Sequence, residues 1–231
     1  MAAYDVDILL PTARFVFSVD GDAVAVLPEH RSPEAFAEYR ALRGARPVVG
    51  MTTFPNTVLL RGEQTIVVDP GLPLQNEPVV RALESRGLSL ADIDRVILTH
   101  AHLDHAGGCA DLLAPVTLHE RETQAPYWVL VGGLLDLLPQ ERLTGESGAI
   151  APGIEWALTR GHCDGHISLC VETPDGPVAL CGDTIGPSRT AFDAMRPDDG
   201  PGAAELLASW ELIRAWRPVR VVAGHLPPFA P

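Results

Sequence analysis

The sequence has few features of a membrane, secreted or nucleic-acid-binding protein. No apolar run approaches the roughly 18 residues of a membrane-spanning helix, and the start, MAAYDVDILLPTARF, has neither the basic end nor the apolar stretch of a signal peptide. Its 17 basic residues stand against 30 acidic ones, so a formal net charge of −13 repels nucleic acid and anionic membranes. We therefore expect a cytoplasmic protein with a small-molecule substrate and no nucleic-acid or membrane partner. The sequence leaves open whether the chain forms a homodimer.

Cysteine is also scarce, and its spacing contains no CxxC pair. The four cysteines are Cys109, Cys163, Cys170 and Cys181. In a chain of this length without a signal peptide, we expect reduced core residues rather than disulfides. The length of 231 residues and a hydrophobic share of 46% predict one globular domain over residues 1–231.

From residue 56 onward, the pattern alternates between strands and helices. Apolar and β-branched runs predict a hairpin over 57–69 and strands over 95–99, 116–119, 155–159, 167–172, 178–183 and 219–225. Apolar residues at helical spacing predict helices over 76–87 and 203–216, and one or two short helices over 125–138. In residues 1–50, we expect edge strands over 13–19 and 23–27 and a short helix over 33–44. The alternation predicts an α/β fold with helices covering the strands.

The segment THAHLDHAGG, residues 99–108, concentrates metal-binding chemistry. His100, His102, Asp104 and His105 fall within six positions, directly after a predicted strand. Zinc accepts imidazole nitrogen and carboxylate oxygen as ligands, so His100 and His102 can reach one ion while Asp104 and His105 face a second. One histidine at a strand end is usually structural, but HxHxDH arises by chance with a probability on the order of one in a thousand in a chain with eight histidines. The cluster therefore predicts a metal site.

More candidate ligands follow at other predicted strand ends. GHCDGH offers His162 and His166, CGDT offers Asp183, and AGH offers His225. Sites in α/β sheets are built at strand ends and in the loops that follow them. We therefore expect these side chains to converge with the 99–108 segment on one edge of the sheet.

These motifs, in this order, resemble the signature of the metallo-β-lactamase-fold hydrolases. That signature is HxHxDH, a histidine in a GHxxGH loop, an aspartate in GD and a late GH. An upstream VDPG matches the family's strand-end aspartate, here Asp69. The resemblance covers roughly residues 52–226, leaves residues 1–50 uncovered, and implies an αββα sandwich with two metal ions in a cleft at one edge.

Carried over position by position, the resemblance implies a complete ligand set. The first metal would be held by His100, His102 and His166, the second by Asp104, His105 and His225, and Asp183 would bridge them. The family pattern assigns the ligand in GHCDGH to the second histidine, which leaves His162 beside the site or in the turn. Asp69 would orient the ligand loop by hydrogen bonds.

The resemblance also implies a hydrolase. A metal-bridging hydroxide would attack an ester, thioester or lactone carbonyl, and Asp104 or Asp183 would orient it and pass a proton to the leaving group. Two divalent ions are implied, zinc first, with iron or manganese as alternatives. True lactamases of this fold lack the bridging Asp183, and many lactonases carry a tyrosine where this chain has Gly186. Glyoxalase II and its short relatives are therefore the most similar group.

An alternative is a mononuclear iron oxidoreductase that resembles persulfide dioxygenases, with the iron held by His100, His102 and Asp183. Two further features leave their roles open. The apolar segment 125–138 either roofs the cleft and binds an acyl chain or packs into the core. Arg189 either pairs with a substrate carboxylate or lies in solvent.

Overall fold

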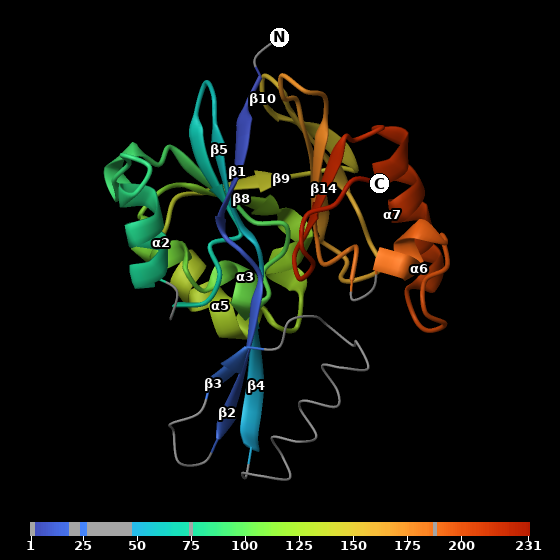
Figure 1. The fold of residues 1–231 in the computed structure, drawn as a ribbon, viewed down its shortest axis with the longest axis horizontal. Helices are drawn as coiled ribbons and strands as arrows, with labels where there is room; N and C mark the ends of the chain where they lie inside the picture. Colours follow the sequence, from blue (N-terminus) through green and yellow to red (C-terminus); the bar gives the residue numbers. More distant parts are fainter. Residues whose placement is uncertain (1–2, 19–23, 27–47, 74–75, 187–188) are drawn as a thin grey trace.

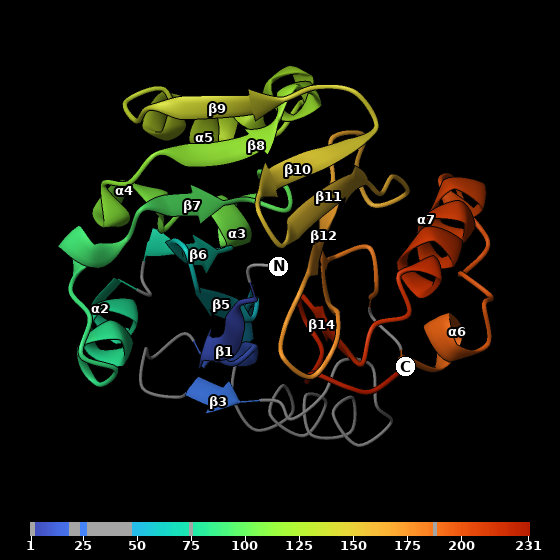
Figure 2. The same cartoon turned by 90° about the horizontal axis from the view of Figure 1, so that it is seen from above.

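The computed structural model describes residues 3–18, 24–26, 48–73, 76–186 and 189–231. Two β-sheets pack face to face, and helices cover the outer face of each, as Figures 1 and 2 show from two directions. This is the predicted αββα sandwich. The helix predicted over 33–44 lies outside the described residues.

The first sheet has six strands in the order β1-β5-β6-β7-β8-β9. Their bounds are β1 Asp5–Leu10, β5 Thr57–Arg61, β6 Thr65–Val68, β7 Arg95–Ile97, β8 Val116–His119 and β9 Gln140–Leu143. Pairing is antiparallel from β1 to β6 and parallel from β6 to β9. The parallel strands β6, β7 and β8 are almost wholly buried, as expected for strands covered on both faces.

The second sheet has five strands in the order β10-β11-β12-β13-β14. Their bounds are β10 Ser147–Ala151, β11 Ile154–Leu158, β12 Ile167–Val171, β13 Val178–Gly182 and β14 Arg220–Ala223. Only the pair β13 and β14 is parallel among these strands. The connection between them carries α6 (Arg189–Asp193) and α7 (Ala203–Ala215), which lie on the outer face of this sheet (Figure 2).

Shorter elements connect the strands of the first sheet. They are α2 (Asn76–Glu84), the 3-10 helix η2 (Leu90–Asp92), α3 (Leu103–Ala106), α4 (Cys109–Leu112), the 3-10 helix η3 (Glu120–Gln124) and α5 (Trp128–Leu135). No helix in the described part of the chain combines the length and apolar character needed to cross a bilayer. A small third sheet, in the order β3-β2-β4, projects from the body beside α3 and α5 (Figure 1). Its strands are β2 Ala13–Ser18, β3 Val24–Val26 and β4 Val48–Phe54.

Three apolar clusters hold the layers together. The first fills the space between the two sheets and includes Leu60, Ile97 and Leu169. The other two lie between each sheet and its helices, where Leu83 packs on the first sheet and Trp210 on the second. Burial of apolar area contributes about 25 cal/mol per Å² to the stability of the fold. These interfaces therefore hold the two sheets, and with them the ends of their strands, in fixed positions.

The strands predicted after residue 56 are confirmed, with ends shifted by a few residues. Strands β1, β4, β9 and β10 were not predicted. β10, with the sequence SGAIA, has little β propensity and exists because β11 pairs along it. The segment 125–138 forms the single helix α5, which buries Val131 and Leu135 in the core and exposes Val129 and Leu130.

Candidate metal centre

The ends of several strands meet at one edge of the sandwich and bring the candidate ligands together. His100 follows β7, and the short helix α3 carries Asp104 and His105. Asp183 follows β13 and His225 follows β14. Ligand atoms within 4.8 Å of one another form three groups: His100, His102 and His162; His100, His105 and Asp183; Asp104, His105 and His225.

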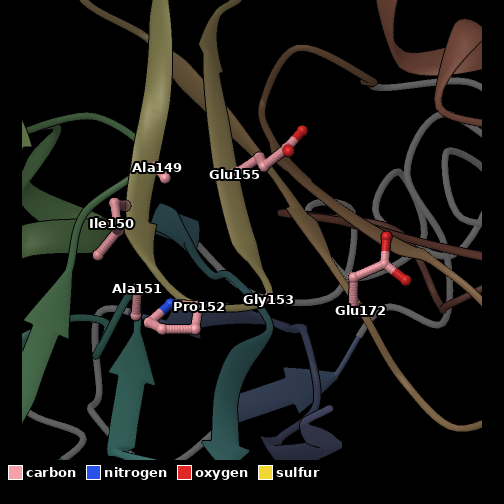
Figure 3. Close-up of a pocket in the computed structure, with 7 residues that line it drawn as sticks. All are labelled: Ala149, Ile150, Ala151, Pro152, Gly153, Glu155 and Glu172. Atoms are coloured by element: carbon pink, nitrogen blue, oxygen red, sulfur yellow. The ribbon is translucent and has the colours of Figure 1, made fainter. Parts of the chain in front are cut away.

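The pocket in Figure 3 lies beside the start of β11, away from the loop that carries His162 and His166. Its lining consists of Ala149, Ile150, Ala151, Pro152, Gly153, Glu155 and Glu172, which include none of the candidate ligands. β11 starts beside this pocket and ends at Leu158, directly before the loop that carries His162 and His166. The chemistry of interest therefore lies at the opposite end of the second sheet.

His100, His102 and His162 form the first cluster. Nε2 of His100 lies 2.9 Å from Nδ1 of His102, and Nε2 of His162 lies 3.1 Å from the same atom. Burial, together with the neighbouring histidines, lowers the pKa of His100 well below its usual value and that of His102 to about 4. Burial also lowers the pKa of His162. The three rings are therefore neutral at pH 7, which is the form that binds a metal.

Asp104, His105 and His225 form the second cluster. Nε2 of His225 lies 3.2 Å from Oδ2 of Asp104, and Nε2 of His105 lies 4.0 Å from that oxygen. Burial opposes ionisation of Asp104, but the hydrogen bond from His225 and the charge of His105 lower its pKa overall. Asp104 is therefore a carboxylate at neutral pH.

Asp183 lies between the two clusters. Its Oδ1 is 3.3 Å from Nε2 of His105 and 3.5 Å from Nε2 of His225. Its Oδ2 is 3.6 Å from Nε2 of His162, in the first cluster. One carboxylate thus presents one oxygen to each cluster, the geometry that a bridging ligand requires.

Within the part of the chain that the structure describes, two buried atoms at the centre, 3.3 Å apart, form no hydrogen bond of ordinary geometry. They are Nε2 of His105 and Oδ1 of Asp183. Buried polar atoms in folded proteins are almost always paired, so an unpaired nitrogen and oxygen facing each other need an explanation. A divalent cation between imidazole and carboxylate ligands satisfies both atoms, and the residues present therefore fit a metal.

The charges of this edge also fit a cation. Although burial disfavours the charged form, the carboxylates of Asp183 and Asp69 raise the pKa of His105 well above its usual value. Burial acts the same way on His225, where hydrogen bonds to Asp104 and Asp183 raise the pKa to about 9. The carboxylates thus attract positive charge, which protons supply here and a metal ion would replace.

His166 is in none of the three groups, although its ring centroid lies 5.0 Å from that of His100. Its Nδ1 lies 3.0 Å from Oγ1 of Thr159 and 2.9 Å from Oγ1 of Thr184. Its Nε2 accepts a hydrogen bond of 3.1 Å from the amide of Asp183. The resemblance placed His166 at the first metal and His162 beside it; in the structure, His162 lies in a group with His100 and His102, and His166 lies next to that group. Because His166 directly precedes β12, sheet pairing holds its ring among buried hydroxyls, while His162 lies on the open part of the loop.

Asp69 supports the ligand loop as the resemblance implied. Its Oδ1 accepts a 2.8 Å hydrogen bond from the amide of Thr99, and its Oδ2 accepts one of 2.7 Å from the Thr99 hydroxyl. The same Oδ2 lies 2.9 Å from Nδ1 of His105. Asp69 holds a left-handed backbone at φ 50°, a conformation that costs a non-glycine residue about 1–3 kcal/mol. The second ring nitrogen of His105 is thereby aimed at the cluster.

Glu122 was not singled out by the sequence. Its side chain is fully buried and accepts a 2.5 Å hydrogen bond from the amide of Ala101, between His100 and His102. Glutamate is common on protein surfaces. The local sequence His119-Glu120-Arg121-Glu122 has no spacing that marks a site. Only the fold brings it under the ligand loop.

Arg189 lies away from the cluster. Its Nε donates to Asp193 at 3.1 Å, another guanidinium nitrogen donates to the carbonyl of Ala230, and the group lies over the ring of Phe229 at 4.8 Å. These contacts favour the surface role over pairing with a substrate carboxylate.

Comparison with known proteins identifies the family to which the chain belongs. A family model of the metallo-beta-lactamase superfamily matches residues 51–225, and the chain belongs to that superfamily. It is similar to metallo-beta-lactamase domain-containing protein 1 of Xenopus laevis, with 28% identity over 75% of this chain and 71% of the relative. It is 34% identical to the hydroxyacylglutathione hydrolase of Cupriavidus metallidurans, over 54% of this chain and 46% of that protein. The chain thus spans about half the length of that hydrolase.

Solved structures agree on the fold. A metallo-β-lactamase-like protein of Thermotoga maritima superposes with a TM-score of 0.69 and 21% identity, covering 99% of this chain and all of the other. An N-acyl homoserine lactone hydrolase superposes with a TM-score of 0.65 and 20% identity, over 96% of this chain and 92% of the other. At these identities, the likeness establishes the fold alone.

Proposed function

We propose that the chain is a hydrolase that uses two divalent metal ions to cleave an ester, thioester or lactone bond in a small molecule. The observation that carries this proposal is the position of Asp183, whose Oδ1 faces His105 and His225 and whose Oδ2 faces His162. The unpaired Nε2 of His105 beside it supports a cation at the same point. A site that held a single ion would not need both clusters.

The proposed ligand set differs from the one that the sequence suggested at a single position. The first metal is held by His100, His102 and His162, the second by Asp104, His105 and His225, and Asp183 reaches both. Zinc is the proposed metal, because neutral imidazole and carboxylate are ligands that it prefers. When bound, such ions polarise a carbonyl and lower the pKa of water towards neutrality.

Two carboxylates of the protein act on the attacking water and its proton. Asp104 is a carboxylate, is partly open to solvent, and accepts a 3.4 Å hydrogen bond from the Thr53 hydroxyl at Oδ2. We assign it the role of holding a proton from the attacking water and passing it to the leaving group. Asp183 is more enclosed and orients the attacking oxygen.

A thioester is the favoured bond within this class. Gly186 offers no side chain where many lactonases place a tyrosine. A thiolate leaves with little protonation, so the missing hydroxyl costs least in that reaction. The hydrolase of Cupriavidus metallidurans is named for an acylated glutathione, which supports the same choice.

The test is a substrate panel run on protein of known metal content. p-Nitrophenyl esters, thioesters of glutathione and coenzyme A, and homoserine lactones are assayed with zinc-, manganese- and iron-loaded protein, and elemental analysis gives the metals per chain. We expect two metals and fastest turnover of a thioester, with His102→Ala as the inactive control. One iron per chain and no hydrolysis of any substrate would instead identify the iron oxidoreductase alternative.

A further inference from the structure

Glu122 lies in η3, directly beyond β8, and its carboxylate is buried between the two loops that carry the first cluster. One loop contains His100 and His102, and the other contains His162. The exposed fraction of Glu122 is 0%. A buried carboxylate is costly unless its oxygens are satisfied, so its partners indicate what it is there to hold.

The carboxylate accepts one hydrogen bond from each loop. The amide of Ala101, between the two histidines of the first loop, donates to Oε2 at 2.5 Å. The thiol of Cys163, in the second loop, donates to Oε1 at 3.5 Å. A Cβ atom on Gly165 would lie 2.4 Å from Oε1, so only glycine allows this approach. Glu122 therefore joins the two loops, through the Ala101 amide of one and the Cys163 thiol of the other.

Tyr127 extends this connection to a candidate ligand. Its hydroxyl donates to Glu122, at 3.0 Å from Oε1 and 2.9 Å from Oε2. Its ring packs edge-on against the ring of His102, with centroids 4.3 Å apart and planes at 71°. Glu122 thus contacts both loops, and Tyr127 contacts both Glu122 and the ring of His102.

We infer that Glu122, acting with Tyr127, is a positioning residue that sets the separation of His102 from His162 and so the affinity for the first metal. This rests on the proposed function, since it assumes that the first cluster binds a metal. Glu122 acts through the Ala101 amide, the Cys163 thiol and the Tyr127 hydroxyl. Outer residues of this kind change metal affinity by about 10- to 100-fold when altered.

The test compares three variants with the wild type. Glu122→Gln keeps the shape but places an NH2 group against an amide or hydroxyl that also donates, which pushes the loops apart. Tyr127→Phe keeps the carboxylate and the ring but loses the hydroxyl. Glu120→Gln, an exposed position in the same 3-10 helix, is the matched control for loss of one negative charge.

Zinc affinities from chelator competition and the visible spectrum of the cobalt-substituted protein are the readouts, with melting temperature recorded for each variant. For Glu122→Gln, we expect the zinc affinity of one of the two sites to fall tenfold or more and the cobalt spectrum to change. The affinity of the other site should stay the same. Tyr127→Phe should show a smaller loss at the same metal, and Glu120→Gln should match the wild type. Tyr127→Phe decides the matter if Glu122→Gln does not fold.

Two results would overturn the inference in distinguishable ways. A wild type that binds two metals, with unchanged affinities and cobalt spectra in both Glu122→Gln and Tyr127→Phe, overturns the positioning role alone. An equal loss of affinity at both metal sites also overturns it, because the substitution would then disturb the whole site rather than position one cluster. A wild type that binds no metal overturns the proposed function together with the positioning role.

Discussion

Nε2 of His162 lies 3.1 Å from Nδ1 of His102, although the two residues are 60 positions apart in the chain. His166, in the same loop as His162, instead occupies both of its ring nitrogens with Thr159, Thr184 and the amide of Asp183. The two histidines of GHCDGH therefore have different surroundings. His162 faces His102, and His166 is held by buried hydroxyls and the amide of Asp183.

This difference predicts opposite effects of the two alanine substitutions. His162→Ala should lose one metal per chain while its melting temperature without metal stays near that of the wild type. His166→Ala should keep two metals but lose stability, by about 1–3 kcal/mol, because it leaves buried hydroxyls without partners. Elemental analysis and thermal unfolding of both variants check this. The reverse result would restore His166 to the ligand set.

Asp183→Asn should lower the affinity for both metals. The substitution removes the charge that lies between the clusters, so we expect a loss of affinity greater than the roughly 10- to 100-fold typical of outer residues. Glu155→Gln, in the pocket at the far end of β11, changes the same charge away from the site and should leave both affinities unchanged. A variant Asp183→Asn that loses only one metal would contradict a bridging role.

Gly224 allows the close approach of β14 to Asp183. A Cβ atom there would lie 2.2 Å from Oδ1 of Asp183 and 3.1 Å from the ring of His105. Gly224→Ala should therefore displace the carboxylate and abolish metal binding and turnover. The control is Gly133→Ala, in α5, where a Cβ meets nothing within 4 Å; it should keep activity and gain about 0.5–1 kcal/mol. Metal content and melting temperature measure both effects.

Asn56 connects the first sheet to the segment that carries His225. Its buried amide donates to the carbonyls of Ala223 and Leu226, both at 2.7 Å, and its oxygen accepts from the amide of Thr12 at 2.9 Å. Asn56→Ala leaves these groups unpaired, and we expect a loss of roughly 2–4 kcal/mol in the free energy of unfolding. Denaturant titration measures it, and a loss below about 0.5 kcal/mol would show that water replaces the amide.

The cysteines should be reduced and slow to react. Cys109 and Cys181 are buried free thiols, and burial raises the pKa of each far above its usual value. A thiol reagent should therefore modify them only after denaturant is added. The mass of the untreated protein should show no disulfide. Rapid modification of either residue in the native protein would mean that the core opens readily.

The sequence predicted the buried strands that are rich in apolar and β-branched residues. β8 (VTLH) and β13 (VALCG) are examples, and both are buried at every position. β9, with the sequence QERL, has polar and partly exposed residues, so no local pattern marks it. It forms because Val116 to His119 offer a free edge with which it pairs.

The candidate site divides in the same way. HxHxDH and the motif order were sufficient to predict where His100, His102, Asp104, His105, Asp183 and His225 gather, since strand ends meet at one edge. The spacing in GHCDGH could not choose between His162 and His166, because both lie within reach of the same edge. Glu122 carries no local signal at all.

By itself, the sequence determined the chemistry available to this protein: histidines and aspartates at strand ends, and apolar strands that must pack between helices. Only the tertiary structure decided which ring faces the cluster, which carboxylate lies between the two groups, and which buried glutamate joins the loops. The reason is that side-chain direction depends on sheet pairing and on contacts between residues far apart in the chain, which no short pattern records.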